Sequence, residues 1–127
     1  MSSQPIIAVD FDGTCVTHEY PYMGRDIGAV PVLRELVDAG NRIILYTMRS
    51  GRLEKSAAEW FKENGIPLYG VNRNPDQKSW TDSPKVYADI YIDDSALGIP
   101  LKMTPDVSRP YVDWERVREL LVSEGFL

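Results

Sequence analysis

The chain has 127 residues, the size of one domain, and we expect residues 1–127 to fold as a single domain. With 43% hydrophobic and 26% charged residues, the composition excludes disordered, collagen-like and membrane-spanning classes. The net charge of −5 argues against broad nucleic-acid binding, so nucleic acid is a candidate partner only as a phosphate end. Residues 1–5 lack the basic start and apolar stretch of a signal peptide, which predicts a cytoplasmic location and no membrane partner.

The rare residues exclude several kinds of site. With one cysteine, Cys15, and one histidine, His18, the chain has no internal disulfide and no zinc site built from thiolates and imidazoles. Any metal would therefore bind oxygen atoms. The sixth position after Cys15 is Pro21, whereas a cysteine phosphatase needs an arginine there. The sequence contains neither a phosphate loop ending in Gly-Lys-Ser/Thr nor a glycine-rich dinucleotide fingerprint.

The first half of the chain alternates strand and helix patterns. An uninterrupted apolar run at residues 6–9 predicts a strand covered on both faces. An apolar stripe with helical spacing lies between Pro31, which suits a first helical turn, and Gly40, which suits a helix end. Residues 43–46 repeat the strand pattern, so this region predicts a strand–helix–strand unit.

The alternation continues to the end of the chain. A second helix is predicted from about Ser50 to Gly65, followed by short strands at residues 68–71 and 90–92 and a last helix at residues 113–123. The inner face of the last helix is predicted to carry Trp114, Val117, Leu120 and Leu121. This order predicts an α/β, three-layer Rossmann-like domain with a mostly parallel central sheet, right-handed crossovers and helices on both faces.

Polar residues directly follow the predicted strands. Asp10 follows the first, Thr47 the second, and Asp93 and Asp94 the fourth. Because the carboxyl ends of parallel strands meet at one edge of a sheet, we expect these residues to form one site. Asp12 joins them, since residues two apart in an extended chain point the same way.

The chemistry of this edge predicts a cation. Two carboxylates 4 Å apart repel by about 4 kcal/mol at an effective dielectric constant near 20. Oxygen ligands open to solvent suit Mg²⁺, which also binds phosphate oxygens, so a phosphate ester is the expected ligand. Gly13 allows a sharp turn after the first strand, Thr14 can anchor that turn through its hydroxyl, and Lys85 can place an ammonium group beside the edge.

These residues resemble the motifs of the haloacid dehalogenase (HAD) superfamily. The run Asp-Phe-Asp-Gly-Thr at residues 10–14 resembles the first motif, Thr47 the second, Lys85 the third and the pair at residues 93–94 the fourth. The motifs occur in the family's order, and the resemblance covers roughly residues 6–98. It implies a HAD-like fold and a phosphatase (a phosphoric monoester hydrolase), because an acid two residues after the first aspartate is similar to the phosphatase and phosphomutase branches.

The resemblance also implies residue roles. Asp10 would attack phosphorus to give an aspartyl-phosphate, and Asp12 would act as general acid and then as general base. Mg²⁺ would be held by the Asp10 carboxylate, the Asp12 backbone carbonyl, and Asp93 or Asp94.

Further residues are candidates for binding the substrate. In the resemblance, Thr47 and Lys85 bind the transferring phosphoryl group. The residues expected to surround the phosphoryl group are Gly13, Thr14, Arg49, Arg52, Arg73 and Asn74. For the two residues after Thr47 the alternative is a solvated helix start, and for the two after the third strand it is a simple turn.

The segments between the motifs are short. Residues 15–30 leave room for a small flap after the first motif, and residues 48–84 for one helix and one strand, so neither segment is expected to hold a cap domain. An open site admits a phosphate on a small molecule or an exposed phosphate on a larger one, or uses a neighbouring subunit as a lid. The proline-containing loop at residues 99–112 could border the site through Lys102 and Arg109.

Several residues have two readings. Tyr20, Tyr22 and Arg25 either pack the flap on the body of the protein or stack on a ring of the substrate. His18 is an acid–base candidate, although Asp12 already has that role in the resemblance. Cys15 is expected to be a small buried thiol.

Two other functions compete with hydrolysis. One is a phosphate- or nucleotide-binding protein that keeps the fold without turnover. The other is a receiver-like phosphoacceptor domain, which also clusters aspartates, a threonine and a lysine on a doubly wound sheet. In receivers the acidic pair lies near the N-terminus, whereas the pair at residues 93–94 comes last here. The chain order therefore favours the hydrolase.

Overall fold

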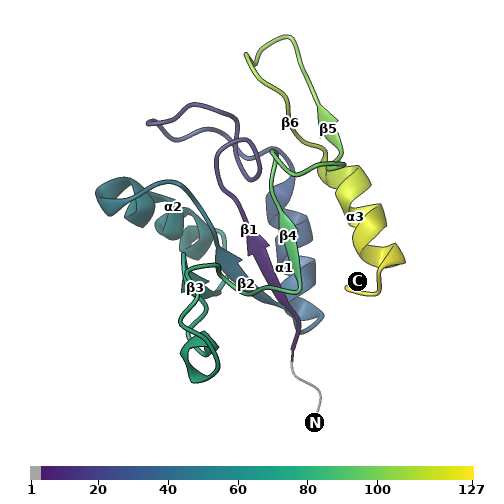
Figure 1. The fold of residues 1–127 in the computed structure, drawn as a ribbon. Helices are drawn as coiled ribbons and strands as arrows, with labels where there is room; N and C mark the ends of the chain where they lie inside the picture. The colour runs from purple at the N-terminus through teal and green to yellow at the C-terminus, as the bar shows by residue number, and fades with distance from the viewer. Residues whose placement is uncertain (1–3) are drawn as a thin grey trace.

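A computed structural model of the chain describes residues 4–127, so part of the stretch considered above for a signal peptide lies outside the described residues. The elements, in chain order, are β1 (Ile6–Val9), α1 (Ala29–Asp38), β2 (Arg42–Leu45), α2 (Gly51–Glu63), β3 (Leu68–Val71), the short 3₁₀ helix η1 (Gln77–Ser79), β4 (Ile90–Ile92), β5 (Leu101–Lys102), β6 (Tyr111–Val112) and α3 (Trp114–Ser123) (Figure 1). None of the helices in this part of the chain has the length and apolar character needed to cross a bilayer.

The central sheet has four parallel strands in the order β3-β2-β1-β4. Val9 at the end of β1 pairs with Leu45 of β2 and with Ile92 of β4, so these three strands end at the same level. The predicted α/β, Rossmann-like class with a mostly parallel sheet is confirmed. The shared level of the strand ends brings the residues that follow them to one edge.

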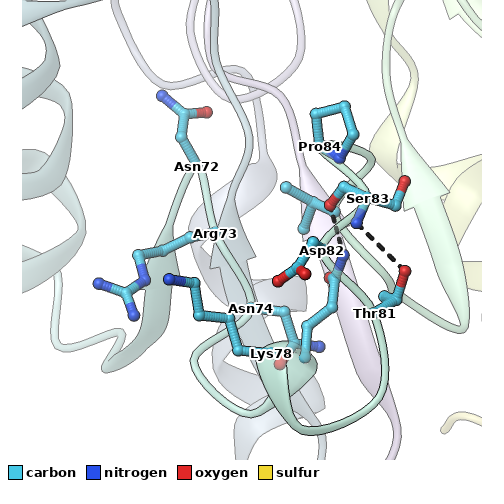
Figure 2. Close-up of a pocket in the computed structure, with 10 residues that line it drawn as sticks. Asn72, Arg73, Asn74, Lys78, Thr81, Asp82, Ser83 and Pro84 are labelled. Carbon is cyan, nitrogen blue, oxygen red and sulfur yellow. Dashed lines mark hydrogen bonds between the residues drawn. The ribbon is translucent and has the colours of Figure 1, made fainter.

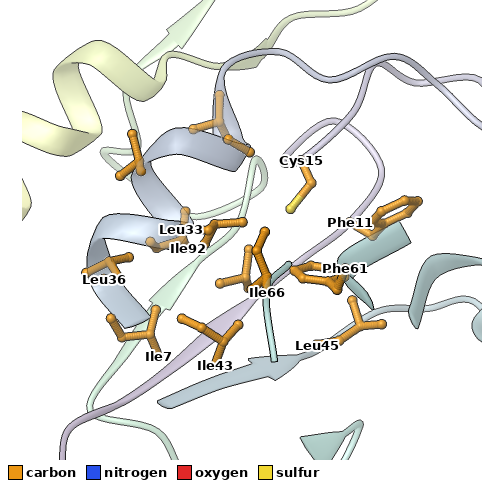
Figure 3. Close-up of a cluster of buried hydrophobic side chains, with 14 of the residues drawn as sticks. Ile7, Phe11, Cys15, Leu33, Leu36, Ile43, Leu45, Phe61, Ile66 and Ile92 are labelled. Carbon is orange, nitrogen blue, oxygen red and sulfur yellow. The ribbon is translucent and has the colours of Figure 1, made fainter. Parts of the chain in front are cut away.

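One face of the sheet carries the main core. Ile7 of β1 and Ile43 of β2 lie on this face with apolar side chains of α1 and α2 (Figure 3), and α3, which packs beside α1, adds its buried residues to the same cluster. The handedness of the connections explains the placement of α1 and α2. The crossovers β1-α1-β2 and β2-α2-β3 step in the same direction along the sheet, and right-handed crossovers in one direction lie on one face.

The second face has no α-helix within residues 4–127, so the prediction of helices on both faces was wrong. The connection from β3 to β4 steps back across β2 and β1, which sends a right-handed crossover to the opposite face. Residues 72–89 make this crossover with only η1 as regular structure. Val86 and Ala88 from this segment cover the second-face residues of β1 and β2, so the third layer is irregular.

The C-terminal part differs from its prediction in two respects. Within the predicted loop at residues 99–112, Leu101 pairs with Val112 in a short antiparallel ladder between β5 and β6. In α3, Leu120 is 51% exposed, whereas Trp114, Val117 and Leu121 are buried. The inner face therefore follows positions i, i+3 and i+7, and Leu120 lies outside it.

Two loops extend beyond the carboxyl ends of the strands (Figure 1). The first joins β1 to α1 and contains most of the flap predicted at residues 15–30, and isolated bridges of Val16 with Asp12 and with Asp26 brace it. The second joins β5 to β6. An ion pair between Arg25 and Asp106 connects the two loops above the sheet edge.

Candidate active site

A cavity of about 500 Å³, the aspartate cavity, opens at the carboxyl ends of β1, β2 and β4. Its lining residues are Asp10, Asp12, His18, Tyr20, Thr47, Met48, Arg49, Asp93, Asp94, Ser95 and Arg109. The structure thus brings together the five polar residues that the strand ends were predicted to gather. Arg109, one of the two cations suggested for the rim, also lines this cavity, and Lys102 does not.

Three carboxylates make up the acidic part of this cavity. One oxygen from each of Asp10, Asp93 and Asp94 lies within 4.8 Å of the others. The Asp12 carboxylate lies outside this group, so the predicted metal role of Asp12 depends on its backbone carbonyl and stays a prediction. Three convergent carboxylate oxygens are a donor set that suits a hard divalent cation such as Mg²⁺.

Crowding of these acids changes their protonation. The pKa of Asp10 is raised from 3.8 to about 8, first by burial and then by the charge of Asp93. The pKa of Asp93 is also raised, chiefly by burial. A cation between the carboxylates would favour their ionised forms, so the site is electrostatically suited to a positive ligand.

Thr14 and Gly13 build the site from behind its wall. The Thr14 hydroxyl donates to Asp10 Oδ2 at 2.9 Å and accepts from the Asp94 backbone N–H at 3.0 Å, which joins the loops after β1 and β4. Gly13 has φ +80°, and a Cβ there would lie 1.9 Å from His18 Nε2. Both residues are buried and neither lines the cavity, so their predicted contact with substrate is replaced by a structural role.

Arg49 forms a buried fork with Asp12. Its Nε and one terminal nitrogen each donate to an Asp12 carboxylate oxygen at 2.8 Å, and that nitrogen also donates to the Tyr22 carbonyl at 2.8 Å. The Arg49 side chain is 1% exposed, and hydrogen bonding to Asp12 raises its pKa. Three of the five N–H groups of Arg49 are thus used by Asp12 and the Tyr22 carbonyl, so the fork binds Asp12 in this structure, and a contact of the remaining guanidinium nitrogen with phosphate stays a prediction.

Thr47 is held by a residue that the sequence analysis missed. The Thr47 backbone N–H donates to Asn72 Oδ1 at 2.8 Å, and Asn72 Nδ2 donates to Glu54 of α2 at 2.7 Å. Asn72 follows β3 directly and has φ 54°, a left-handed conformation that asparagine tolerates better than most residues. Its position after a strand, like that of the aspartates, was the signal that could have identified it.

Lys85 approaches the aspartates from the second face of the sheet. It lines a cavity of about 310 Å³ together with Asp10 and Asp93, which also line the aspartate cavity. Its ammonium nitrogen lies 5.9 Å from the centre of the Tyr91 ring. Within residues 4–127, Lys85 forms no ion pair with an acid at 4.0 Å or less, so its charge is available to a ligand in this region.

Three predicted substrate-binding residues lie elsewhere. Arg52 is exposed on α2 and does not line the aspartate cavity. Arg73 and Asn74 line a different cavity of about 360 Å³, which we call the β3 cavity (Figure 2). Asn74 is buried there, where it donates to the Tyr87 carbonyl at 3.1 Å and accepts from the Asp76 N–H at 3.0 Å. Its amide therefore stabilises the loop of the second face.

His18 is closer to the acids than the sequence suggested. Its Nε2 lies 2.6 Å from Asp94 Oδ2, and both side chains are largely buried. The flap brings His18 to this position, which a single sequence does not reveal. Tyr20 and Met48 also line the cavity and are 59% and 96% exposed. Cys15 is fully buried, as predicted.

Comparison with known proteins finds similar solved structures. No family model matches the chain, and no curated protein matches it. The chain is similar to the solved structure of a conserved protein from Bacteroides thetaiotaomicron, with 34% sequence identity and a TM-score of 0.79. The match covers 97% of this chain and 93% of that one.

Proposed function

We propose that this chain, which belongs to the same family as the conserved Bacteroides thetaiotaomicron protein, is a Mg²⁺-dependent phosphohydrolase that cleaves phosphate monoesters through an aspartyl-phosphate on Asp10. The observation that carries the proposal is the convergence of Asp10, Asp93 and Asp94 within 4.8 Å at the end of β1 and β4. The HAD-like motif order fits this proposal. The lack of a family match means that membership of that superfamily is part of the proposal.

The residues present fit a magnesium ion. Asp10, Asp93 and Asp94 supply carboxylate oxygens, and burial raises the pKa of Asp10 to about 8, so bringing a cation to these acids relieves an electrostatic cost. When bound, Mg²⁺ neutralises charge on the phosphoryl group and orients it. The Asp12 backbone carbonyl is a further proposed ligand.

Asp10 is the proposed nucleophile. Thr14 holds Asp10 Oδ2 through its hydroxyl, which fixes the orientation of the carboxylate. The bond from Asp10 to phosphorus forms while the bond from phosphorus to the ester oxygen breaks, and that oxygen takes a proton as it leaves. Thr47 and Lys85 stand beside Asp10 as partners for the phosphoryl oxygens.

Asp12 is the proposed acid and base. In the second half of the reaction, water attacks phosphorus, the bond to Asp10 breaks, and Asp12 takes the proton from that water. The fork from Arg49 fixes the orientation of the Asp12 carboxylate in the cavity. In the first half, Asp12 gives a proton to the leaving oxygen, for which one hydrogen bond of the fork has to open.

The proposed substrate is a phosphate on a small molecule or an exposed phosphate on a larger one. The segments after β1 and β2 are short, which supports an open site without a cap domain. A neighbouring subunit as a lid, and hence an oligomer, remains a prediction. We also propose a cytoplasmic location, with which the single buried thiol of Cys15 agrees.

Hydrolysis of an aryl phosphate in the presence of Mg²⁺ tests the proposal. We expect turnover by the native protein and a loss of at least about 10³-fold in Asp10→Asn. Asp82→Asn is the matched control, because Asp82 is exposed in the β3 cavity. Full activity of Asp10→Asn would rule out the aspartyl-phosphate route. Binding of Mg²⁺ without hydrolysis across a broad panel of phosphate esters would favour the non-hydrolytic binding protein.

A further inference from the structure

Resting on the proposed hydrolysis, we infer that the aspartate cavity takes a small phosphate monoester whose leaving group carries a flat aromatic ring, such as a nucleobase. Tyr20 and Met48 form the subsite for that ring. The acids, Thr47 and Lys85 account for a phosphoryl group and its cation. Tyr20, Met48 and Arg109 line the same cavity and have no part in the transfer, so they face the remainder of the substrate.

Tyr20 is held in place with much of its surface open. The guanidinium of Arg49 lies 5.4 Å from the centre of the Tyr20 ring and supports it by a cation–π contact. Arg49 is itself fixed by Asp12 and by the Tyr22 carbonyl. Tyr20 nevertheless remains 59% exposed, so a supported ring presents free aromatic surface at the cavity. A stacking partner can be bound there with little loss of side-chain entropy.

Met48 is held out of the core by its neighbours. The Thr47 N–H is bound to Asn72 at 2.8 Å, and the Arg49 N–H is bound to Thr47 Oγ1 at 3.1 Å. With the backbone tied on both sides and Arg49 turned inward, Met48 is 96% exposed. An exposed thioether at a cavity wall adapts its shape to a ligand and makes favourable contacts with aromatic rings.

The size and charge of the cavity fit a ligand of this class. The cavity volume of about 500 Å³ lies within the range of small-molecule sites. This volume is larger than a phosphate group alone would fill. Arg109 adds a cation that can lie over an aromatic face. An acyclic, hydroxylated leaving group would leave the apolar surfaces of Tyr20 and Met48 in water, so these two residues would add no binding free energy for it.

Kinetics with three substrates test the subsite, namely a nucleoside 5′-monophosphate, O-phosphotyrosine and glycerol 3-phosphate. We expect Tyr20→Ala to lower kcat/KM for the nucleotide by about fivefold or more, the value of one stacked base. Glycerol 3-phosphate should change by less than about twofold. Tyr20→Phe keeps the ring and should retain activity. Leu97→Ala is the control, because Leu97 is 106% exposed and does not line the cavity.

The change in kcat/KM for O-phosphotyrosine in Tyr20→Ala shows whether the subsite accepts any aromatic ring or prefers a nucleobase. A loss in Tyr20→Ala equal to that of the nucleotide supports a subsite for any aromatic ring, and a smaller loss supports a nucleobase. An equal loss for glycerol 3-phosphate would overturn the aromatic subsite, because Tyr20 would then act on the shared phosphate.

Binding measurements keep this test independent of turnover. With Mg²⁺ present, Asp10→Asn protein should bind the nucleoside monophosphate more tightly than glycerol 3-phosphate by calorimetry. Adding Tyr20→Ala should remove that difference. Equal binding of the two ligands overturns the subsite and leaves the hydrolysis test of Asp10 untouched. A preserved difference without hydrolysis by the native protein overturns only the proposed function.

Discussion

The aspartate cavity and the β3 cavity are both polar hollows beside the same sheet, and they differ in how their polar groups are paired. In the β3 cavity, the side-chain amides of Asn74 (Figure 2) and of Gln77 are buried, and the oxygen and the nitrogen of each amide are hydrogen-bonded to backbone atoms. In the aspartate cavity, three carboxylates meet without a lysine or arginine within 4.0 Å of them in residues 4–127.

The comparison shows that crowded acids of like charge distinguish the aspartate cavity from the β3 cavity better than size does. Their volumes, about 500 and 360 Å³, are similar. A buried amide whose hydrogen-bond donors and acceptor are all paired within the protein stabilises a loop and does not need a ligand to satisfy it. Partly buried acids that repel each other keep a free-energy cost in the folded protein, which a cation can remove. This difference predicts how each cavity responds to substitution, to pH and to Mg²⁺.

The largest expected effect is on stability without metal. The unfolded chain releases the Asp10 proton near pH 3.8, whereas the folded protein retains it up to about pH 8. The free energy of unfolding should therefore fall as pH rises between these values, by at most roughly 6 kcal/mol, and level off above about pH 8. Asp10→Asn should reduce this slope, and Mg²⁺ should restore stability to the native protein at high pH.

Chemical denaturation in EDTA at pH 5 and pH 8.5 measures the slope. Asp38→Asn is the control, because Asp38 is exposed at the end of α1 and changes the net charge by the same amount. An unchanged slope in Asp10→Asn would show that the cluster does not carry the electrostatic cost.

Removing the Arg49 fork should have the next largest effect. Arg49→Met leaves the Asp12 carboxylate, 16% exposed, without its partner. We expect kcat/KM for an aryl phosphate to fall by about 10²-fold, within the usual range for acid–base catalysis, and stability to fall by about 2–3 kcal/mol. Arg49→Lys, which keeps the charge and loses the fork, should fall between the native protein and Arg49→Met.

A double variant tests whether the loss of stability in Arg49→Met comes from the unpaired Asp12 charge. In Arg49→Met/Asp12→Asn, the uncompensated charge is gone, so stability should recover while activity stays low. Because this variant also lacks the Asp12 carboxylate, recovery of both would show that neither Asp12 nor its fork is needed for hydrolysis.

The affinity for Mg²⁺ should depend on pH. Because the pKa of Asp10 is about 8 without a cation, binding must release that proton at neutral pH. The association constant should rise by about tenfold per pH unit between pH 6 and pH 7 and flatten above pH 8. Calorimetry in two buffers with different ionisation enthalpies measures both the affinity and the released proton. A constant affinity over this range would contradict the raised pKa.

The sequence predicted the parts of this site that depend on strand periodicity. Asp10, Thr47 and the acids at residues 93–94 come together because each follows an apolar strand, and a parallel sheet aligns the strand ends. This inference needs only the fold class. It does not need any side-chain geometry.

Long-range side-chain pairs were beyond the reach of that reasoning. Arg49 and Asp12 are 37 residues apart, and His18 and Asp94 are 76 apart. The path of the flap decides both contacts, and no periodic pattern encodes it. The helix expected on the second face was wrong for a related reason: handedness places the β3–β4 crossover on that face and leaves its conformation open.

The smallest expected effects come from the β3 cavity. Asn74→Ala removes hydrogen bonds to Tyr87 and Asp76, both of them on the second face, so stability should fall by about 1–2 kcal/mol. Hydrolysis of an aryl phosphate should stay within about twofold, because neither bond reaches Asp10 or Thr47. Arg73→Ala, at an exposed position in the same cavity, should change neither quantity measurably. Thermal unfolding and initial rates on the same preparations separate the two responses. A large loss of activity in Arg73→Ala would make the β3 cavity part of the substrate site and remove the contrast between the two hollows.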